Sequence, residues 1–175
     1  MTILKLSFLC SCLMLNSVVQ QSCSGPGEVI IATDDKVTTD DMIENVDLDG
    51  YALISSVEFS GDEGAYQFRV GISSQETGCD QYADWWEVLD GDGNLIYRRI
   101  LAHSHVDEQP FVRSGGAVQI SATDRVIVRA HMNNTGYGRQ AYTGSVQEGF
   151  SEEILPEDFF LALDQVAPLP DGCAF

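Results

Sequence analysis

Alternation of apolar and polar residues is the feature that most constrains how this chain folds. Apolar side chains recur at every second position over residues 51–59, apart from Ser55, and again, after the turn-forming residues 61–64, over residues 66–72. Side chains along a strand point alternately to opposite faces, so this period predicts antiparallel strands with one buried face. Further apolar runs of similar length follow at residues 85–89, 95–101, 117–121, 125–132 and 141–146.

The number and spacing of these runs predict an all-β fold. Roughly seven or eight short strands separated by Gly and Asp suit a single antiparallel β-sandwich, immunoglobulin-like or jelly-roll. We place this domain at residues 50–175. One short helix is expected near its C-terminus, because Pro156, Glu157 and Asp158 precede an apolar run, and proline and acidic residues are favoured in the first turn of a helix.

The segment Asp90–Asn94 is rich in aspartate and needs to be distinguished from a calcium loop. An EF-hand loop that began at Asp90 would require Gly at its sixth position and Glu at its twelfth, where this chain has Leu95 and Leu101. We therefore predict a hairpin turn between two strands.

The N-terminus reads as a targeting segment. Residues 1–22 carry a single charge, Lys5, and an apolar run that ends in polar residues, which predicts a cleaved signal peptide. Cys23 then suits lipid attachment, although Gln20 stands where a lipobox usually has Leu or Val. The prediction is an exported lipoprotein, periplasmic or on the cell surface, with simple secretion as the alternative. Residues 23–49 are expected to form an acidic, flexible tether.

Two cysteines remain once Cys10 and Cys12 leave with the signal and Cys23 is acylated. These are Cys79 and Cys173. In an oxidising compartment two remaining thiols most simply pair, so we predict a disulfide. Two free, buried cysteines are the alternative.

The charge of the chain excludes one class of partner. The formal net charge is −18, and so acidic a surface does not bind nucleic acid or anionic lipid through bulk electrostatics. Beyond the signal, Lys36 is the single lysine against seven arginines. This bias resembles that of proteins adapted to salty surroundings.

All three histidines of the chain fall within residues 94–132. His103 and His105 are expected to end one strand on a shared face, and His131 to end another. If these strands are neighbours or face each other across the sandwich, three neutral imidazoles form a site with an open position, which suits zinc or copper. Met132 or Asp107 is the candidate fourth ligand. A metal-free alternative has the histidines bonded to loop backbone.

Arginines oppose this metal hypothesis. Arg98, Arg99 and Arg129 are close to the histidines in sequence, and clustered cations repel a dication unless acids such as Glu87 and Asp107 neutralise them.

Aromatic residues support a competing hypothesis without metal. Adjacent tryptophans on a strand point to opposite faces, so at most one of Trp85 and Trp86 belongs to the core. With Tyr97, the other would offer a stacking surface for a glycan, or the loop Val106–Gly116 would bind a partner protein. The alternative packs this indole beneath a loop. No motif of nucleophilic catalysis is present, and no catalytic residue is predicted.

Three segments carry a resemblance to known sequences: GCDQYADWWEVLD, LIYRRILAHSHVDEQPFVRSGG and VRAHMNNTGYG. Together they resemble a group of short, uncharacterised exported bacterial proteins and lipoproteins. The resemblance covers about residues 77–138. It implies one compact exported domain and brings no activity, cofactor or catalytic residue.

Overall fold

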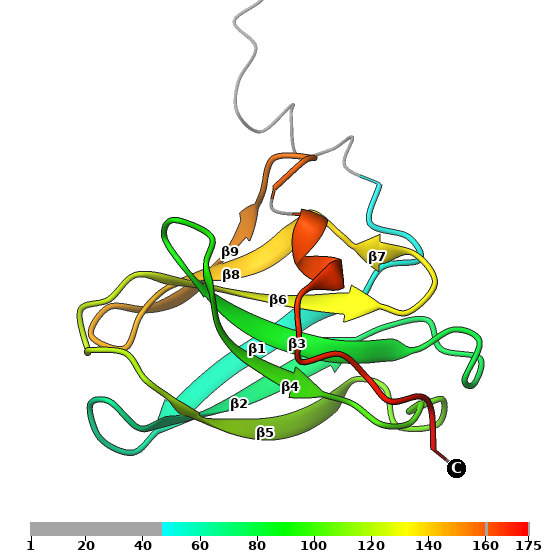
Figure 1. Cartoon of the computed structure of the whole chain (residues 1–175), viewed down its shortest axis with the longest axis horizontal. Coiled ribbons are helices and arrows are strands. Elements are labelled where there is room, and N and C mark those ends of the chain that lie inside the picture. The colour runs from blue at the N-terminus through cyan, green and yellow to red at the C-terminus, as the bar shows by residue number, and fades with distance from the viewer. Residues whose placement is uncertain (1–46, 160, 175) are drawn as a thin grey trace, which may run out of the picture. The chain divides into compact units, whose positions relative to one another are not determined.

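The computed structural model describes residues 47–159 and 161–174, which belong to the unit Val37–Phe175. The predicted signal peptide, Cys23 and nearly all of the tether lie outside the described residues. The described part contains nine strands and one short helix, shown in Figure 1: β1 Leu53–Ser60, β2 Tyr66–Ser73, β3 Ala83–Asp90, β4 Leu95–Ile100, β5 Phe111–Val118, β6 Val126–Met132, β7 Gly136–Tyr137, β8 Gln140–Ser145, β9 Gly149–Ile154 and the 3₁₀ helix η1 Leu161–Gln165.

The strands form two antiparallel sheets, which confirms the predicted all-β sandwich. The smaller sheet has the order β1-β2-β5, and the larger has the order β4-β3-β6-β8-β9 with β7 paired to β6. In β2 the side chains of Phe68, Val70 and Ile72 are buried in the core whereas Gln67 and Arg69 are exposed. The period of two that is visible in the sequence is therefore the period of burial.

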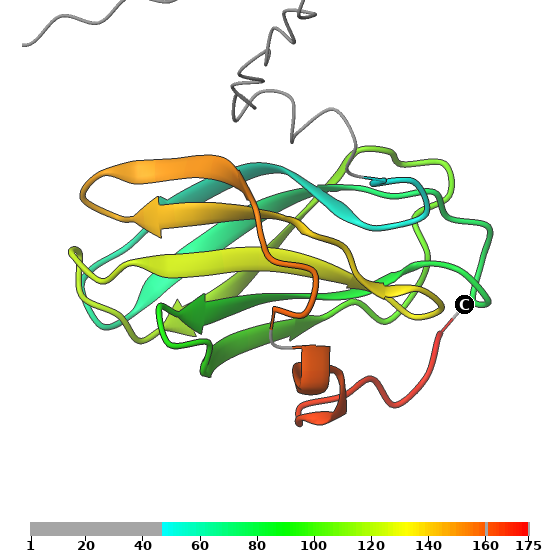
Figure 2. The ribbon, with the colours of Figure 1, turned by 90° about the horizontal axis from the view of Figure 1, so that it is seen from above.

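The larger sheet is covered on both of its faces. Strand β6 is buried along its whole length and β3 along all but its last residue. Trp86 and Val128 face the smaller sheet, whereas Leu89 and Ile127 belong to a second apolar cluster with Leu155. The C-terminal segment, with η1, lies on this outer side of the larger sheet (Figure 2).

Two edges of the sheets meet where β4 approaches β5. The Arg99 side chain donates to the Ser114 carbonyl at 3.1 Å. At Gly115 a Cβ atom would lie 2.9 Å from the Trp86 ring and 2.7 Å from the Tyr97 hydroxyl, so glycine is required for this close approach of backbone to aromatic side chains.

The turn after β3 confirms the predicted hairpin. The Asp90 carboxylate accepts the backbone N–H groups of Asp92 and Asn94 at 2.9 and 2.8 Å. The Asn94 side-chain amide donates to it as well, at 2.8 Å, and this bond, together with the backbone bonds, holds the pKa of Asp90 below its usual range. Gly93 has φ 82°, a left-handed conformation that favours glycine. The Asp90 carboxylate therefore stabilises the turn by accepting its backbone N–H groups.

Two strands differ from the prediction. Strand β5 begins at Phe111, not near residue 117, and the sequence did not predict the edge strand β9, in which Ser151, Glu152 and Glu153 are exposed. The predicted short C-terminal helix is present as the five-residue η1, none of whose side chains is buried. Since no side chain of η1 is buried, its sequence does not need the spacing of apolar residues that is typical of a longer helix.

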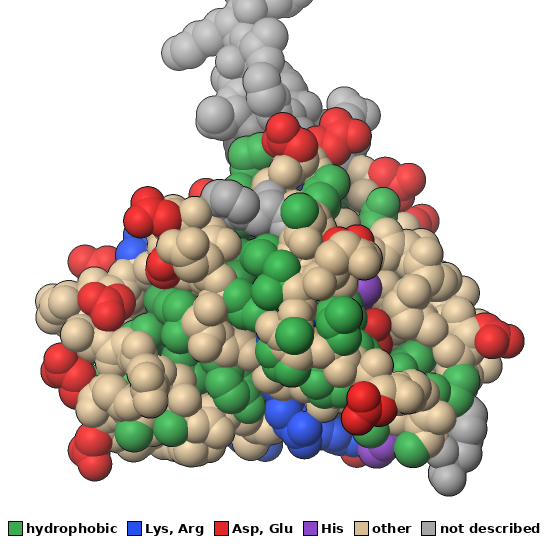
Figure 3. Space-filling view, viewed as in Figure 1, with side chains coloured by type: hydrophobic (Ala, Val, Ile, Leu, Met, Phe, Trp, Pro, Cys, Tyr) green, Lys and Arg blue, Asp and Glu red, His purple; other side chains and the backbone are tan. Residues whose placement is uncertain are grey.

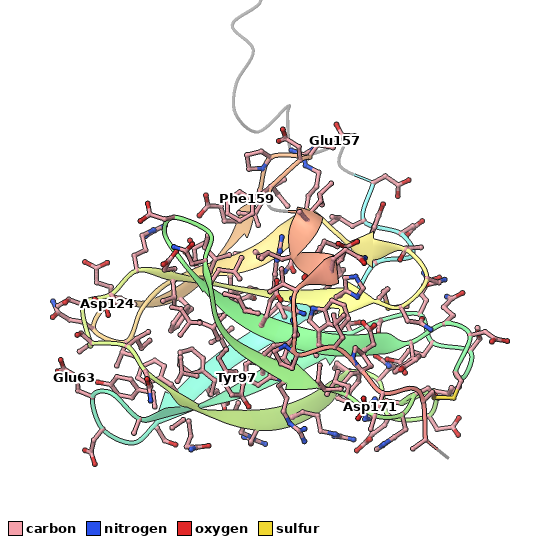
Figure 4. All side chains as sticks on the ribbon, viewed as in Figure 1. Glu63, Tyr97, Asp124, Glu157, Phe159 and Asp171 are labelled. Carbon is pink, nitrogen blue, oxygen red and sulfur yellow. A yellow bond between two sulfur atoms is a disulfide. The ribbon has the colours of Figure 1, made fainter. Side chains whose placement is uncertain are left out.

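The predicted disulfide is confirmed. Cys79 pairs with Cys173, with 5.6 Å between the α-carbons, and appears as the yellow bond in Figure 4. The neighbouring Ala174 N–H donates to the Ala102 carbonyl at 2.6 Å. The end of the C-terminal segment is therefore attached beside the loop that follows β4.

We expect the double variant Cys79→Ser/Cys173→Ser to lose about 4 kcal/mol of unfolding free energy, because a loop of 94 residues is no longer closed in the unfolded chain. Urea denaturation measures this loss. Wild-type protein unfolded under reducing conditions is the control and should match the variant. Equal midpoints for the oxidised wild type and the variant would contradict the prediction.

Candidate functional site

Two of the three histidines lie together in the connection between β4 and β5. The sequence predicted that His103 and His105 end a strand. Strand β4 ends earlier, at Ile100, so both histidines belong to a loop. Their ring centroids are nevertheless 4.7 Å apart. We call residues 101–110 the histidine loop.

His105 carries a buried imidazole that makes no hydrogen bond to any described residue. The residue is 4% exposed, its ring stacks on Phe111 with 3.9 Å between centroids, and neither ring nitrogen has a partner in the described part of the chain. Burial lowers the pKa of His105, Arg113 adds to this effect, and Glu76 opposes it. The ring is therefore neutral at neutral pH, which is the form that binds metal ions.

His103, by contrast, is exposed. Both histidines line a hollow of about 340 Å³ that is completed by Ser104, Val106, Asp107 and Glu108. The negative charge of Glu108 is neutralised by Arg113, which lies 2.7 Å away. The hydrogen bond from Arg113 lowers the pKa of Glu108. Asp107 is exposed and leaves a carboxylate at the same opening.

His131 lies in a different environment, on the outer face of the larger sheet. Its Nδ1 is 2.7 Å from a carboxylate oxygen of Asp84, and its ring stacks on Trp85 with 3.7 Å between centroids. Asp84 reaches it because β3 has a register shift between Ala83 and Trp85, and such a bulge redirects a side chain. Met132, the next residue, points into the core and is fully buried.

The predicted arrangement of three histidines with Met132 is not formed. Within residues 47–159 and 161–174, no three His, Cys, Asp or Glu side chains form a group that could hold a metal ion. The physical reason is twofold: β3 lies between β4 and β6, and alternation turns His131 and Met132 to opposite faces. The structure brings together His103 and His105 only.

Two of the three arginines near the histidines in sequence, Arg98 and Arg129, are neutralised by Glu87. Glu87 is fully buried and accepts from Arg98 at 2.6 Å and from Arg129 at 2.8 Å. Arg98 also donates to the carbonyls of Leu163 and Pro168 at 2.8 and 3.0 Å. We call Glu87, Arg98 and Arg129 the buried ion cluster.

The sequence did not reveal that the C-terminal segment completes this cluster. Arg129 donates to the Phe159 carbonyl at 2.9 Å, and Phe159 is labelled beside η1 in Figure 4. Burial raises the pKa of Tyr137, whose hydroxyl accepts from Arg98 at 3.2 Å. In the C-terminal segment the two arginines bind backbone carbonyls. Contacts of this kind cannot be predicted from a pattern of side chains.

The structure does not expose the aromatic surface that the glycan hypothesis needs. Trp86 is 0% and Trp85 is 3% exposed, and Tyr97 is half-buried with its ring centroid 5.6 Å from that of Trp86. The Trp85 ring packs against Arg98, His131 and Tyr137, so it is not available as a stacking surface. The exposed apolar side chains on this side are instead Leu161, Val166 and Leu169, and Figure 3 shows hydrophobic side chains at the centre of this face with acidic ones around it.

Comparison with known proteins gives one relative. A protein of Halomicrobium mukohataei, described as a candidate lipoprotein, is 36% identical over 90 residues, which are 51% of this chain and 44% of that protein. The chain thus covers less than half of the length of this relative. No family model matches, and no solved structure matches. Among the described residues, no helix is both long and apolar enough to span a membrane.

We expect Glu87→Gln to lower the unfolding free energy by about 3–5 kcal/mol, because it leaves two buried guanidinium groups without their shared carboxylate. Thermal or urea unfolding measures the change. The matched control is Glu58→Gln, which breaks the exposed pair with Arg69 and should cost less than about 1 kcal/mol. Equal effects of the two variants would show that the buried ion cluster is not needed for stability.

Proposed function

We propose that the chain is an exported, lipid-anchored β-sandwich protein that binds a transition metal ion, copper or zinc, through His103 and His105. The proposal of a lipid anchor is supported by the signal-like residues 1–22, by Cys23 and by the description of the relative as a candidate lipoprotein. It agrees with the resemblance of three sequence segments to exported lipoproteins. Which face of a membrane the domain occupies is left to experiment.

His105 is the observation that carries the metal proposal. Buried polar groups in proteins nearly always have hydrogen-bond partners, and leaving one unsatisfied costs roughly 1–3 kcal/mol. Here neither nitrogen of a buried, neutral ring has a hydrogen-bond partner among the described residues, and a second imidazole is adjacent. A metal ion bound between the two rings would satisfy a nitrogen of His105.

The surroundings of the pair suit an open metal site. Two imidazoles leave further coordination positions for water or for Asp107, which lines the same hollow. Both zinc and copper(II) accept mixed nitrogen and oxygen ligands. The net charge of −18 raises the local concentration of cations around the domain.

Recognition of a partner protein by the segment Val106–Gly116 is a second candidate. Val106 is 48% and Val112 is 37% exposed, so this segment offers apolar side chains to solvent beside the hollow. Binding of a glycan has no comparable support, since both indoles are buried.

We expect the purified domain to bind a single copper or zinc ion, and His103→Gln or His105→Gln to weaken binding by about tenfold or more, which is about 1.4 kcal/mol. Titration calorimetry and elemental analysis measure affinity and stoichiometry. His131→Gln is the matched control and should keep wild-type affinity, because His131 is bonded to Asp84.

Three outcomes are decisive. Loss of binding only in the two loop variants supports the histidine pair. An equal loss of metal affinity in His131→Gln would contradict the histidine pair, because it would show that His131 also takes part in binding. If the wild type binds no metal at micromolar concentrations, the metal proposal is wrong and partner recognition becomes the leading function.

We expect metabolic labelling with a palmitate analogue to label the wild-type protein in its membrane fraction and to leave Cys23→Ser unlabelled and soluble. The reason is that acylation of this single sulfur provides the membrane anchor. A wild type that is secreted without label would support the secretion alternative.

A further inference from the structure

Glu76 is a buried carboxylate in contact with the histidine loop. It lies in the connection between β2 and β3, and its side chain has no exposed area. One carboxylate oxygen accepts the Ser74 hydroxyl at 2.8 Å and the Ala83 N–H at 3.2 Å. The other accepts the backbone N–H of His105. The carboxylate therefore fixes the backbone of the loop at His105.

The same oxygen faces the ring of that histidine. Glu76 Oε2 lies 3.9 Å from His105 Nδ1, while stacking on Phe111 sets the plane of the imidazole to within 14° of the phenyl ring. The position of the backbone, the plane of the ring and the nitrogen that faces the carboxylate are thus all determined by neighbours. The 3.9 Å separation is longer than a hydrogen bond, so Glu76 acts on this ring nitrogen through its charge.

We infer that Glu76 is the positioning residue of the metal site: it keeps the proton of neutral His105 on Nδ1, so that Nε2 carries the lone pair that binds the metal. This inference deepens the proposed function and, for its metal-binding part, rests on it. Glu76 itself is not a ligand.

Electrostatics favour this tautomer. With the proton on Nδ1 the N–H dipole points toward a carboxylate, whereas the other tautomer places a nitrogen lone pair against the negative oxygen in a medium of low dielectric constant. Metal-binding histidines commonly use their second nitrogen in this way, and changing the outer partner typically lowers metal affinity by about 10- to 100-fold. No sequence pattern indicates this role, because Glu76 precedes His105 by 29 residues.

The tautomer is measured first, in metal-free wild-type protein. Long-range ¹H–¹⁵N NMR of histidine side chains distinguishes a proton on Nδ1 from one on Nε2, and the His105→Gln spectrum assigns the signal. We expect the Nδ1–H form for His105. A predominant Nε2–H form, or equal populations of the two, would overturn the inference whether or not a metal binds.

Metal affinity is measured next, with copper(II) and zinc chloride as probes. We expect Glu76→Gln to lower affinity by about 10- to 100-fold, while the surface variant Glu58→Gln binds as the wild type does. Unchanged affinity in Glu76→Gln would overturn the positioning role. Circular dichroism and the wild-type NMR result keep the test valid if Glu76→Gln folds poorly. No binding by the wild type would refute the proposed function itself, and the tautomer still decides the role of Glu76.

Discussion

The carboxylate of Glu87, buried between Arg98 and Arg129, is the interaction on which the outer half of this structure depends. Charges removed from water are tolerated only with close partners, and one carboxylate cannot satisfy two guanidinium groups. The remaining donors reach the carbonyls of residues 159–168. The C-terminal segment is thereby held against a sheet although no side chain of η1 is buried, and the Cys79–Cys173 bond secures its far end.

This arrangement decides which residues remain accessible for binding. On the outer face of the larger sheet, Trp85 and His131 are enclosed among Asp84, Tyr137 and Arg98 of the ion cluster. A surface that the sequence suggested for glycan binding is therefore part of the packing. The histidine loop, by contrast, offers accessible side chains, because His103 is exposed there and the loop lines a hollow.

The histidine loop and the ion cluster differ in whether their buried polar side chains have hydrogen-bond partners. Every member of the ion cluster has charged or carbonyl partners, so it is a structural unit. His105 is equally buried, yet its ring nitrogens lack partners within the described residues, while its backbone is fixed by Glu76. A rigidly placed ring with an unused lone pair is the arrangement that ligand binding requires and that stability alone does not explain.

The sequence by itself determined the two-layer β architecture, the hairpin at Asp90 and the pairing of Cys79 with Cys173, because alternation, turn residues and the cysteine count act locally or leave few choices. It also named Glu87, together with Asp107, as an acid able to neutralise the arginines. Only the tertiary structure decided that His103 and His105 come together without His131, that both tryptophans are buried, and that Glu76 contacts His105. These depend on a bulge at Asp84, on the order of strands and on backbone carbonyls of a distant segment, none of which leaves a periodic signal in the sequence.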